Sequence, residues 1–232
     1  MSLGQSSAYK YNPISILGEK LVARGMAVIA AACNDGSDGV WMVCDTGLGD
    51  LATSVASFDN AYGIYHSFTY GSSVSYPYSP SASWGKVINL PASATLVPIF
   101  EQGGSLSDGC EDTIYNGVDV KGKVVLAIGD LSRCDSVKRG EHAQKAGAAA
   151  LLVQTTPMGL GKLNGNASFP MASIENKAGD DLIAAWKKSH STKFTWSKSV
   201  SNFLVEGGGG PSYFSSRGLD GELRSKPDIA AP

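Results

Sequence analysis

The chain has 232 residues, of which 43% are hydrophobic, and its formal net charge is −2. This size and composition allow a sizeable core in one or two domains. The small net charge does not favour a nucleic-acid or membrane-surface partner, and no apolar run approaches the ~20 residues of a membrane-spanning helix. Four cysteines, an even number, allow two disulfides in an oxidising compartment. A cytosolic protein would instead keep them as free thiols.

The first predicted elements are a helix and a strand. Asn12 and Pro13 are typical of a helix start, and apolar residues at helical spacing predict a helix that ends before Gly25. Residues 26–32, MAVIAAA, form a continuous apolar run that is typical of a central parallel strand covered on both faces. Residues 33–36 then form a polar turn at the carboxyl end of this strand, where functional groups gather in open α/β sheets.

The middle of the chain predicts a second set of elements. Residues 62–93 are rich in Ser, Tyr, Pro and Gly with little periodicity, and we interpret them as an ordered linker. Residues 120–155 predict a parallel pair of strands joined by a helix, with a cysteine in the first loop. Further strands are expected at residues 94–100, 170–174 and 192–196, and a helix is expected at residues 177–188. The four glycines 207–210 are interpreted as an exit hinge.

One family resemblance rests on residues 120–155. The order GKVVL, an Arg-Cys pair, a lysine and AGAAALLV resembles a protease-associated (PA) domain. A generic strand-helix-strand unit is the alternative, but it would not need the cysteine in the loop. The resemblance implies an inserted PA domain over residues 94–205. It also implies a disulfide between Cys110 and Cys134, on either side of the first strand of the unit.

A second resemblance rests on blocks outside that region. The segment SLG, an Asn-Pro helix start and MAVIAAACNDG, with the next strand at 53–60, resembles a subtilisin-like serine protease (subtilase). Residues 213–218, YFSSRG, and 226–232, KPDIAAP, resemble the blocks that precede the nucleophilic serine of that family. A domain-sized insertion between such blocks is a subtilase feature. The whole is similar to the secreted PA-containing subtilases, particularly the fungal minor extracellular protease type.

The two resemblances together imply an α/β fold in which a partial subtilisin-like parallel sheet encloses a PA domain. Its two non-contiguous segments are residues 1–61 and 206–232. The N-terminus has neither the basic nor the apolar region of a secretory signal, so we expect a processed product or, in our preferred interpretation, a piece of a longer secreted endopeptidase.

The subtilase resemblance implies site residues in the first segment. Asn34 would donate its side-chain amide to the oxyanion of the tetrahedral intermediate, although an Asn in an Asn-Asp-Gly turn is usually only a turn residue. The strand that pairs with substrate would be Ser2, Leu3 and Gly4, and the wall of the P1 pocket would be Ala31, Ala32 and Cys33. The family normally has Gly at the position of Cys33, so its side chain should narrow the pocket or be tied back by a bond. Residues 1–3 are also compatible with a cloning remnant.

Other chemistry-bearing residues are expected to be structural. Asp45-Thr46-Gly47 matches the catalytic aspartate motif of subtilases and of aspartic proteases, but it follows Asn34 in the chain and has no second carboxylate site. His66, His142 and His190 lie outside the His-Gly-Thr setting of a subtilase base, and no Gly-Thr-Ser nucleophile motif is present. We therefore expect the chain alone to be inactive.

The remaining expectations concern the second disulfide, glycosylation, cofactors and partners. Cys33 and Cys44 are expected to form a second disulfide, and two free thiols are the alternative. Zinc binding is not expected, because no second ligand pair has a short Cys/His spacing. Asn166 begins a glycosylation sequon. We expect no cofactor and no metal, and we expect protein or peptide substrates, the remainder of the catalytic domain, and self-association through an unpaired sheet edge. A non-catalytic PA-domain binding module is the alternative function.

Overall fold

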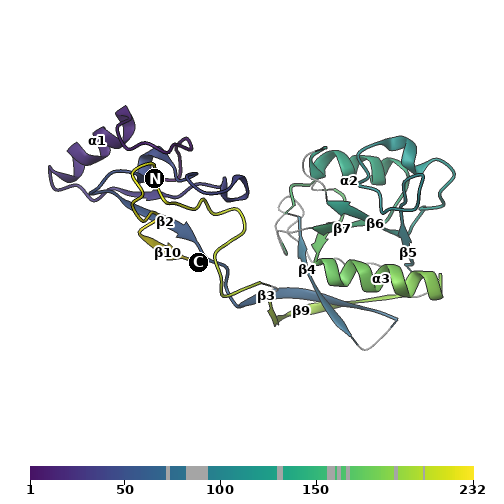
Figure 1. Cartoon of the computed structure of the whole chain (residues 1–232). Helices are drawn as coiled ribbons and strands as arrows, with labels where there is room; N and C mark the ends of the chain where they lie inside the picture. Colours follow the sequence, from purple (N-terminus) through teal and green to yellow (C-terminus); the bar gives the residue numbers. More distant parts are fainter. Residues whose placement is uncertain are drawn as a thin grey trace. The chain divides into compact units, whose positions relative to one another are not determined.

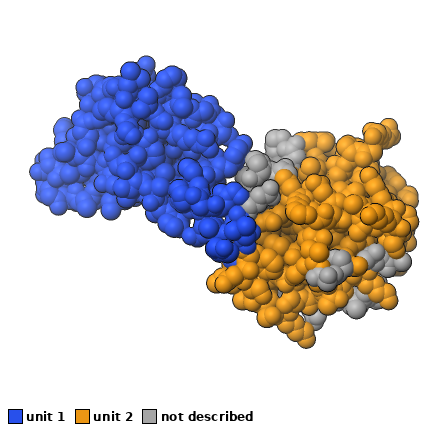
Figure 2. Space-filling model, turned by 60° about the horizontal axis from the view of Figure 1, so that its bottom comes forward, with its two compact units in different colours: residues 1–63, 204–232 blue, residues 64–203 orange. Residues whose placement is uncertain are grey.

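The computed structural model describes residues 1–71, 74–81, 94–129, 133–155, 160, 163–165, 168–190, 193–205 and 207–232. The chain forms two compact units, which Figure 2 distinguishes by colour. Unit 1 contains residues 1–63 and 204–232, and unit 2 contains residues 64–203. The secondary structure is mixed α/β, as expected.

The centre of unit 1 is a parallel sheet whose described strands lie in the order β1-β2-β10. These are β1 (Ile29–Ala31), β2 (Thr53–Ser57) and β10 (Ile229–Ala231). Ile29 is in register with Thr53, and Ile229 is in register with Val55. The two distant segments of the chain therefore contribute to one sheet.

Helix α1 (Pro13–Val22) begins as the sequence predicts. The Asn12 side chain accepts hydrogen bonds from the backbone N–H groups of Ile14 (3.0 Å) and Ser15 (2.9 Å), which satisfies two of the free donors of the first turn. The side of the helix that is buried carries small residues, Ser15 and Gly18, whereas Leu17 is exposed.

Unit 2 is built on a sheet whose described strands follow the order β5-β6-β7-β8-β4-β3-β9 (Figure 1). Strands β5 to β8 are parallel, and β4 joins β8 and β3 in antiparallel pairs. The bounds are β3 Tyr62–Tyr70, β4 Ser75–Pro80, β5 Leu96–Pro98, β6 Val124–Gly129, β7 Ala150–Thr155, β8 Met171–Ile174 and β9 Phe194–Leu204. The helices are α2 (Ser136–Lys145) and α3 (Asn176–Lys188).

The parallel strands of unit 2 are buried on both faces. Val124 and Leu126 of β6 belong to one apolar cluster with Leu182 of α3, whereas Val125 belongs to a second cluster with Ala143 of α2. Successive side chains of a strand point to opposite faces, so α2 and α3 cover opposite faces of this sheet (Figure 1). The continuous apolar runs follow from this two-sided burial.

The structure differs from the sequence-based expectations in three places. Residues 62–93, which we interpreted as a linker, contain β3 and β4, because Phe68, Tyr70 and Tyr78 bury their rings against the core of unit 2; residues 82–93 lie outside the described part. The glycines 207–210 are not an open hinge. Gly209 N–H donates to Asp59 O (2.8 Å), and a Cβ on Gly208 would lie 2.4 Å from Asn60 O.

The third difference is the strand expected over 26–32. Only Ile29–Ala31 is strand, and it lies at one end of the described β1-β2-β10 order instead of in its centre. The outer edge of β1 receives the N-terminal segment of the chain, since Ala31 N–H donates to Met1 O (2.9 Å). Ile29 remains 55% exposed.

Candidate functional site

The loop that follows β1 is fixed by a distant part of the chain. Ser216 N–H donates to Cys33 O (2.9 Å), and Asp35 N–H donates to Ser216 Oγ (3.0 Å). Gly36 N–H donates to Phe214 O (2.9 Å), and a Cβ on Gly36 would lie only 2.1 Å from Ser215 O. Residues 33–36 are therefore packed against residues 214–216, and glycine is required at position 36.

Asn34 lies within this fixed loop. Its side chain is exposed, while the residues on either side of it, Cys33 and Asp35, carry the backbone hydrogen bonds to Ser216. Cys33 has a φ of 79°, a conformation that favours glycine. The loop thus presents an amide side chain from a backbone that is held on both sides.

The N-terminal segment lies beside the same loop. Thr46 Oγ1 donates to Leu3 O (3.0 Å), and Gln5 N–H donates to Asp45 Oδ1 (3.1 Å) while Gln5 O accepts from Asp45 N–H (3.0 Å). These contacts give the buried Asp-Thr-Gly turn, 3₁₀ helix η2 (Asp45–Gly47), a structural role. It holds residues 3–5 in place.

A disulfide joins the two sides of this arrangement. Cys33 and Cys44 are bonded, with their Cα atoms 5.6 Å apart. Gly4 packs on Cys44, because a Cβ at position 4 would lie 2.8 Å from Cys44 Sγ and 2.9 Å from Thr46 Oγ1. Gly4, expected in the substrate-pairing strand, and Cys33, expected in the wall of the P1 pocket, are therefore both neighbours of Cys44.

A cavity of about 420 Å³ opens at the end of the unit 1 sheet. Its lining comes from the N-terminal residues, the edge of β1, the end of β2 and the last residues of the chain, and it includes Met1, Ser2, Ala31, Ser57, Ala231 and Pro232. Ser2 and Ala31 thus line one cavity.

In unit 2, a loop is attached to the start of α2 by several bonds. Cys110 is disulfide-bonded to Cys134, and the buried Asp108 accepts an ion-pair contact from Arg133 Nη1 (3.0 Å). The backbone oxygen of Asp108 accepts from Nε of the fully buried Arg139 (2.7 Å), and His142 Nδ1 lies 3.3 Å from Gly109 O. Residues 108–110 therefore have little freedom.

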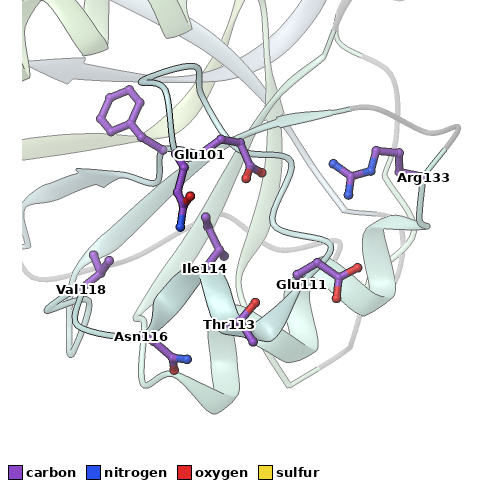
Figure 3. Close-up of a pocket in the computed structure, with 9 residues that line it drawn as sticks. Glu101, Glu111, Thr113, Ile114, Asn116, Val118 and Arg133 are labelled. Atoms are coloured by element: carbon purple, nitrogen blue, oxygen red, sulfur yellow. The ribbon is translucent and has the colours of Figure 1, made fainter.

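A pocket of about 580 Å³ lies beside this loop (Figure 3). It is bordered by the turn after β5, the 3₁₀ helix η3 (Asp112–Tyr115) and Arg133, which directly precedes Cys134. The lining consists of Phe100, Glu101, Gln102, Glu111, Thr113, Ile114, Asn116, Val118 and Arg133. Next to it, burial raises the pKa of Tyr115 far above its ordinary value.

Comparison with known families identifies part of the chain. Residues 92–182 match the PA domain family, and this range contains the disulfide-bonded loop, α2, β5 to β8 and the pocket. The chain contains a PA domain. No curated protein matches the sequence.

Several solved structures resemble the chain at low identity. A psychrophilic subtilisin-like protease from the Antarctic psychrotroph Pseudoalteromonas sp. AS-11 is 19% identical, with a TM-score of 0.42, over 88% of this chain and 53% of that protein. An aminopeptidase from Aneurinibacillus sp. strain AM-1 is 19% identical, with a TM-score of 0.42, over 64% of this chain and 34% of the aminopeptidase. A zinc aminopeptidase from Bacillus subtilis is 14% identical, with a TM-score of 0.40, over 63% and 34%. The chain thus spans about a third to a half of these proteins.

The sequence did not find the pocket of the PA domain, because its charged residues come from separate loops with no shared spacing. It also missed Asp45 and Thr46 as the residues that hold the N-terminal segment, although Asp and Thr followed by a glycine are a typical turn signal. The sequon residue Asn166 lies outside the described residues.

Among the described residues, no helix has both the length and the apolarity to cross a membrane. Likewise, no group of three or more His, Cys, Asp or Glu side chains among them is arranged to hold a metal ion.

Proposed function

We propose that the chain is part of a secreted subtilisin-like serine endopeptidase that carries a PA domain, similar to the fungal minor extracellular protease. The observation that carries this proposal is the meeting of the two subtilase-like blocks around Asn34. Asp35 and Ser216, which bond each other, are 181 residues apart in the chain, and β10 of the KPDIAAP block pairs with β2 in the same parallel sheet. In an unrelated fold, these two sequence blocks would not be expected to lie side by side.

In this function Asn34 donates its side-chain amide to the oxyanion that forms when a serine attacks the scissile carbonyl. A neutral donor suits this task, because the charge develops only in the transition state. The two backbone contacts to Ser216 fix the loop before the reaction begins. Ser2, Leu3 and Gly4 pair with the substrate backbone, and Ala31, Ala32 and Cys33 line the P1 pocket.

The residues that complete a Ser-His-Asp triad would come from elsewhere in the catalytic domain. His66, His142 and His190 all lie in unit 2, on β3, in α2 and after α3. We expect the 232-residue chain to be inactive on its own, because none of them has the His-Gly-Thr setting of a subtilase base and the sequence holds no Gly-Thr-Ser motif. Its two disulfides suit an oxidising, extracellular location. The PA domain restricts or recruits substrate, or it stabilises the enzyme as an appendage.

A non-catalytic binding module is the second candidate. It is favoured by the PA domain, which has its own two-sided core, its own disulfide and its own pocket. Peptide hydrolysis distinguishes the two, because a binding module requires no oxyanion donor.

The test uses the natural coding sequence extended at both ends, with Asn34→Ala and the matched control Asn202→Ala on the exposed side of β9. The extended protein should cleave a fluorogenic peptide and react with a serine-directed phosphonate, whereas the 232-residue chain should do neither. Asn34→Ala should lower kcat by about 10²–10³ with little change in KM, a magnitude carried over from subtilisin itself. Phosphonate labelling of the 232-residue chain, or full activity of Asn34→Ala, would contradict the proposal.

A further inference from the structure

The pocket beside η3 combines apolar side chains with two carboxylates. We propose that it binds a peptide segment that carries both lysine or arginine and apolar side chains. Its volume of about 580 Å³ lies within the ~300–1,000 Å³ that is usual for ligand pockets. The proposal concerns the PA domain alone, so it does not depend on the proteolytic function proposed above.

The apolar part of the pocket is already ordered. The ring of Phe100 contacts Trp186 of α3, with the ring centroids 5.8 Å apart. Ile114 packs against the cluster that α2 covers, and Val118 is 36% exposed in the lining. Lysine and arginine carry long hydrocarbon stems, which can lie on such a surface while the charged end stays in contact with water.

The acidic part of the pocket is held by the neighbouring turns. Glu101 Oε1 accepts from Ser107 Oγ (2.6 Å), so one carboxylate oxygen is fixed and the other is left for a ligand. Glu111 directly follows Cys110 of the disulfide. In the part of the chain that the structure describes, its carboxylate forms no ion pair. Figure 3 shows Glu101 and Glu111 projecting from separate segments, with Ile114 nearby.

The cation in the lining does not cancel this charge. Arg133 is paired with Asp108, whose side chain is buried and also accepts from Cys110 N–H (2.9 Å). The two charges of that pair offset each other, so the net charge of the pocket is negative and comes from the carboxylates of Glu101 and Glu111. A cationic side chain would therefore be attracted, whereas an acidic peptide would be repelled. Because the Cys110–Cys134 bond already orders the loop, little entropy is lost on binding.

Fluorescence anisotropy on the 232-residue chain tests the proposal with two probes. One is a fluorescein-labelled pentapeptide of alternating leucine and lysine, and the other has glutamate in place of lysine. The variants are Glu111→Gln, Glu111→Lys and the matched control Glu141→Lys, which makes the same charge change at an exposed position of α2 outside the pocket. Thermal unfolding of each variant verifies that it is folded.

The lysine peptide should bind at least tenfold more tightly than the glutamate peptide, and salt should weaken its binding. Glu111→Gln should weaken it roughly threefold to tenfold, Glu111→Lys should remove the preference between the two peptides because the new charge offsets that of Glu101, and Glu141→Lys should change neither. Equal binding of both peptides, absence of binding, or the same response to Glu141→Lys as to Glu111→Lys would overturn the proposal. Such a failure would leave the assignment of Asn34 unaffected, because that residue lies in unit 1.

Discussion

Gly4 lies directly against the Sγ atom of Cys44, at a distance that leaves no space for a side chain. A Cβ at position 4 would be 2.8 Å from that sulfur, which is bonded to Cys33 next to Asn34. The proposed substrate strand and the proposed oxyanion loop are therefore coupled through one disulfide. A substitution that displaces one of these two segments should therefore displace the other as well.

Gly4→Ala tests this coupling. The added methyl group should displace residues 3–5 or the disulfide and lower the free energy of unfolding by about 1–3 kcal/mol, the usual cost of overpacking. Urea denaturation measures the loss. Gly210→Ala is the matched control, since its nearest neighbour would be Gly207 O at 3.6 Å, an ordinary contact. Equal stability of Gly4→Ala and Gly210→Ala would show that Gly4 is free to move.

An ion pair with one buried partner, Lys226, connects the last segment of the chain to β2. Lys226 Nζ donates to Ala52 O (3.0 Å) and to Asp228 Oδ2 (2.8 Å), and the same oxygen accepts from Ser54 N–H (2.7 Å). Asp228→Asn removes the charge that compensates Lys226, whose side chain is only 4% exposed. We expect a loss of roughly 2–3 kcal/mol, below the range for a fully buried pair because Asp228 is 37% exposed.

The same substitution at an exposed pair is the control for this prediction. Asp119→Asn breaks the surface pair with Lys123 and should cost less than about 0.5 kcal/mol. Hydrogen exchange in residues 53–57 is the readout, since faster exchange there in Asp228→Asn reports on the strand that the pair supports. Unchanged exchange would mean that β10 and β2 do not need the pair.

Hydrogen exchange should also separate the two units. β1 is three residues long and Ile29 is more than half exposed, whereas residues 124–126 of β6 are completely buried and paired with strands on both sides. We therefore expect residues 26–32 and 213–232 to exchange faster than residues 123–128 in the native chain. Light scattering must first show a monomer, because association through a sheet edge would protect the same amides. Equal protection in a monomeric sample would contradict the expectation.

The buried phenol of Tyr115 predicts a pH dependence. Burial raises its pKa in the folded chain, so the folded state keeps the proton at a pH where the unfolded chain, with a pKa of about 10, loses it. The stabilisation is fully present below about pH 10 and is lost as the pH rises above that value. Between neutral and strongly alkaline pH, the urea midpoint should therefore fall less for Tyr115→Phe than for the unchanged chain. Parallel pH profiles would refute this.

Local chemistry explains which parts of the fold could be predicted. Asn12 caps α1 and Asp135 caps α2 with a side-chain bond to Lys138 N–H, and both caps depend only on neighbouring residues. The apolar runs at 124–128 and 148–153 also read correctly as buried strands, since a helix covers each face of their sheet. In these elements the local pattern and the tertiary environment agree.

The elements that were missed depend on distant partners. Residues 197–204 of β9 are mostly polar and largely exposed, and they form a strand because β3 lies beside them. In β3 and β4 the rings of Phe68, Tyr70, Tyr76 and Tyr78 alternate with small or polar residues, a period-two signal that the Ser and Pro content concealed. Similarly, the loop that contains Asn34 is held by bonds from Cys33 and Asp35 to Ser216, which no local pattern reveals.

The hydrogen bond from Val205 N–H to Ala61 O (3.0 Å) closes the chain on itself where unit 2 begins and ends. Residues 62–204 therefore form a loop that this bond closes, and the entropic free-energy cost of closing a loop rises by only about 0.6 kcal/mol for each doubling of its length. The stability of the unit 1 sheet should depend little on the length of the segment between Ala61 and Val205. We therefore expect this junction to accept a short β-hairpin with the same end-to-end spacing in place of the PA domain.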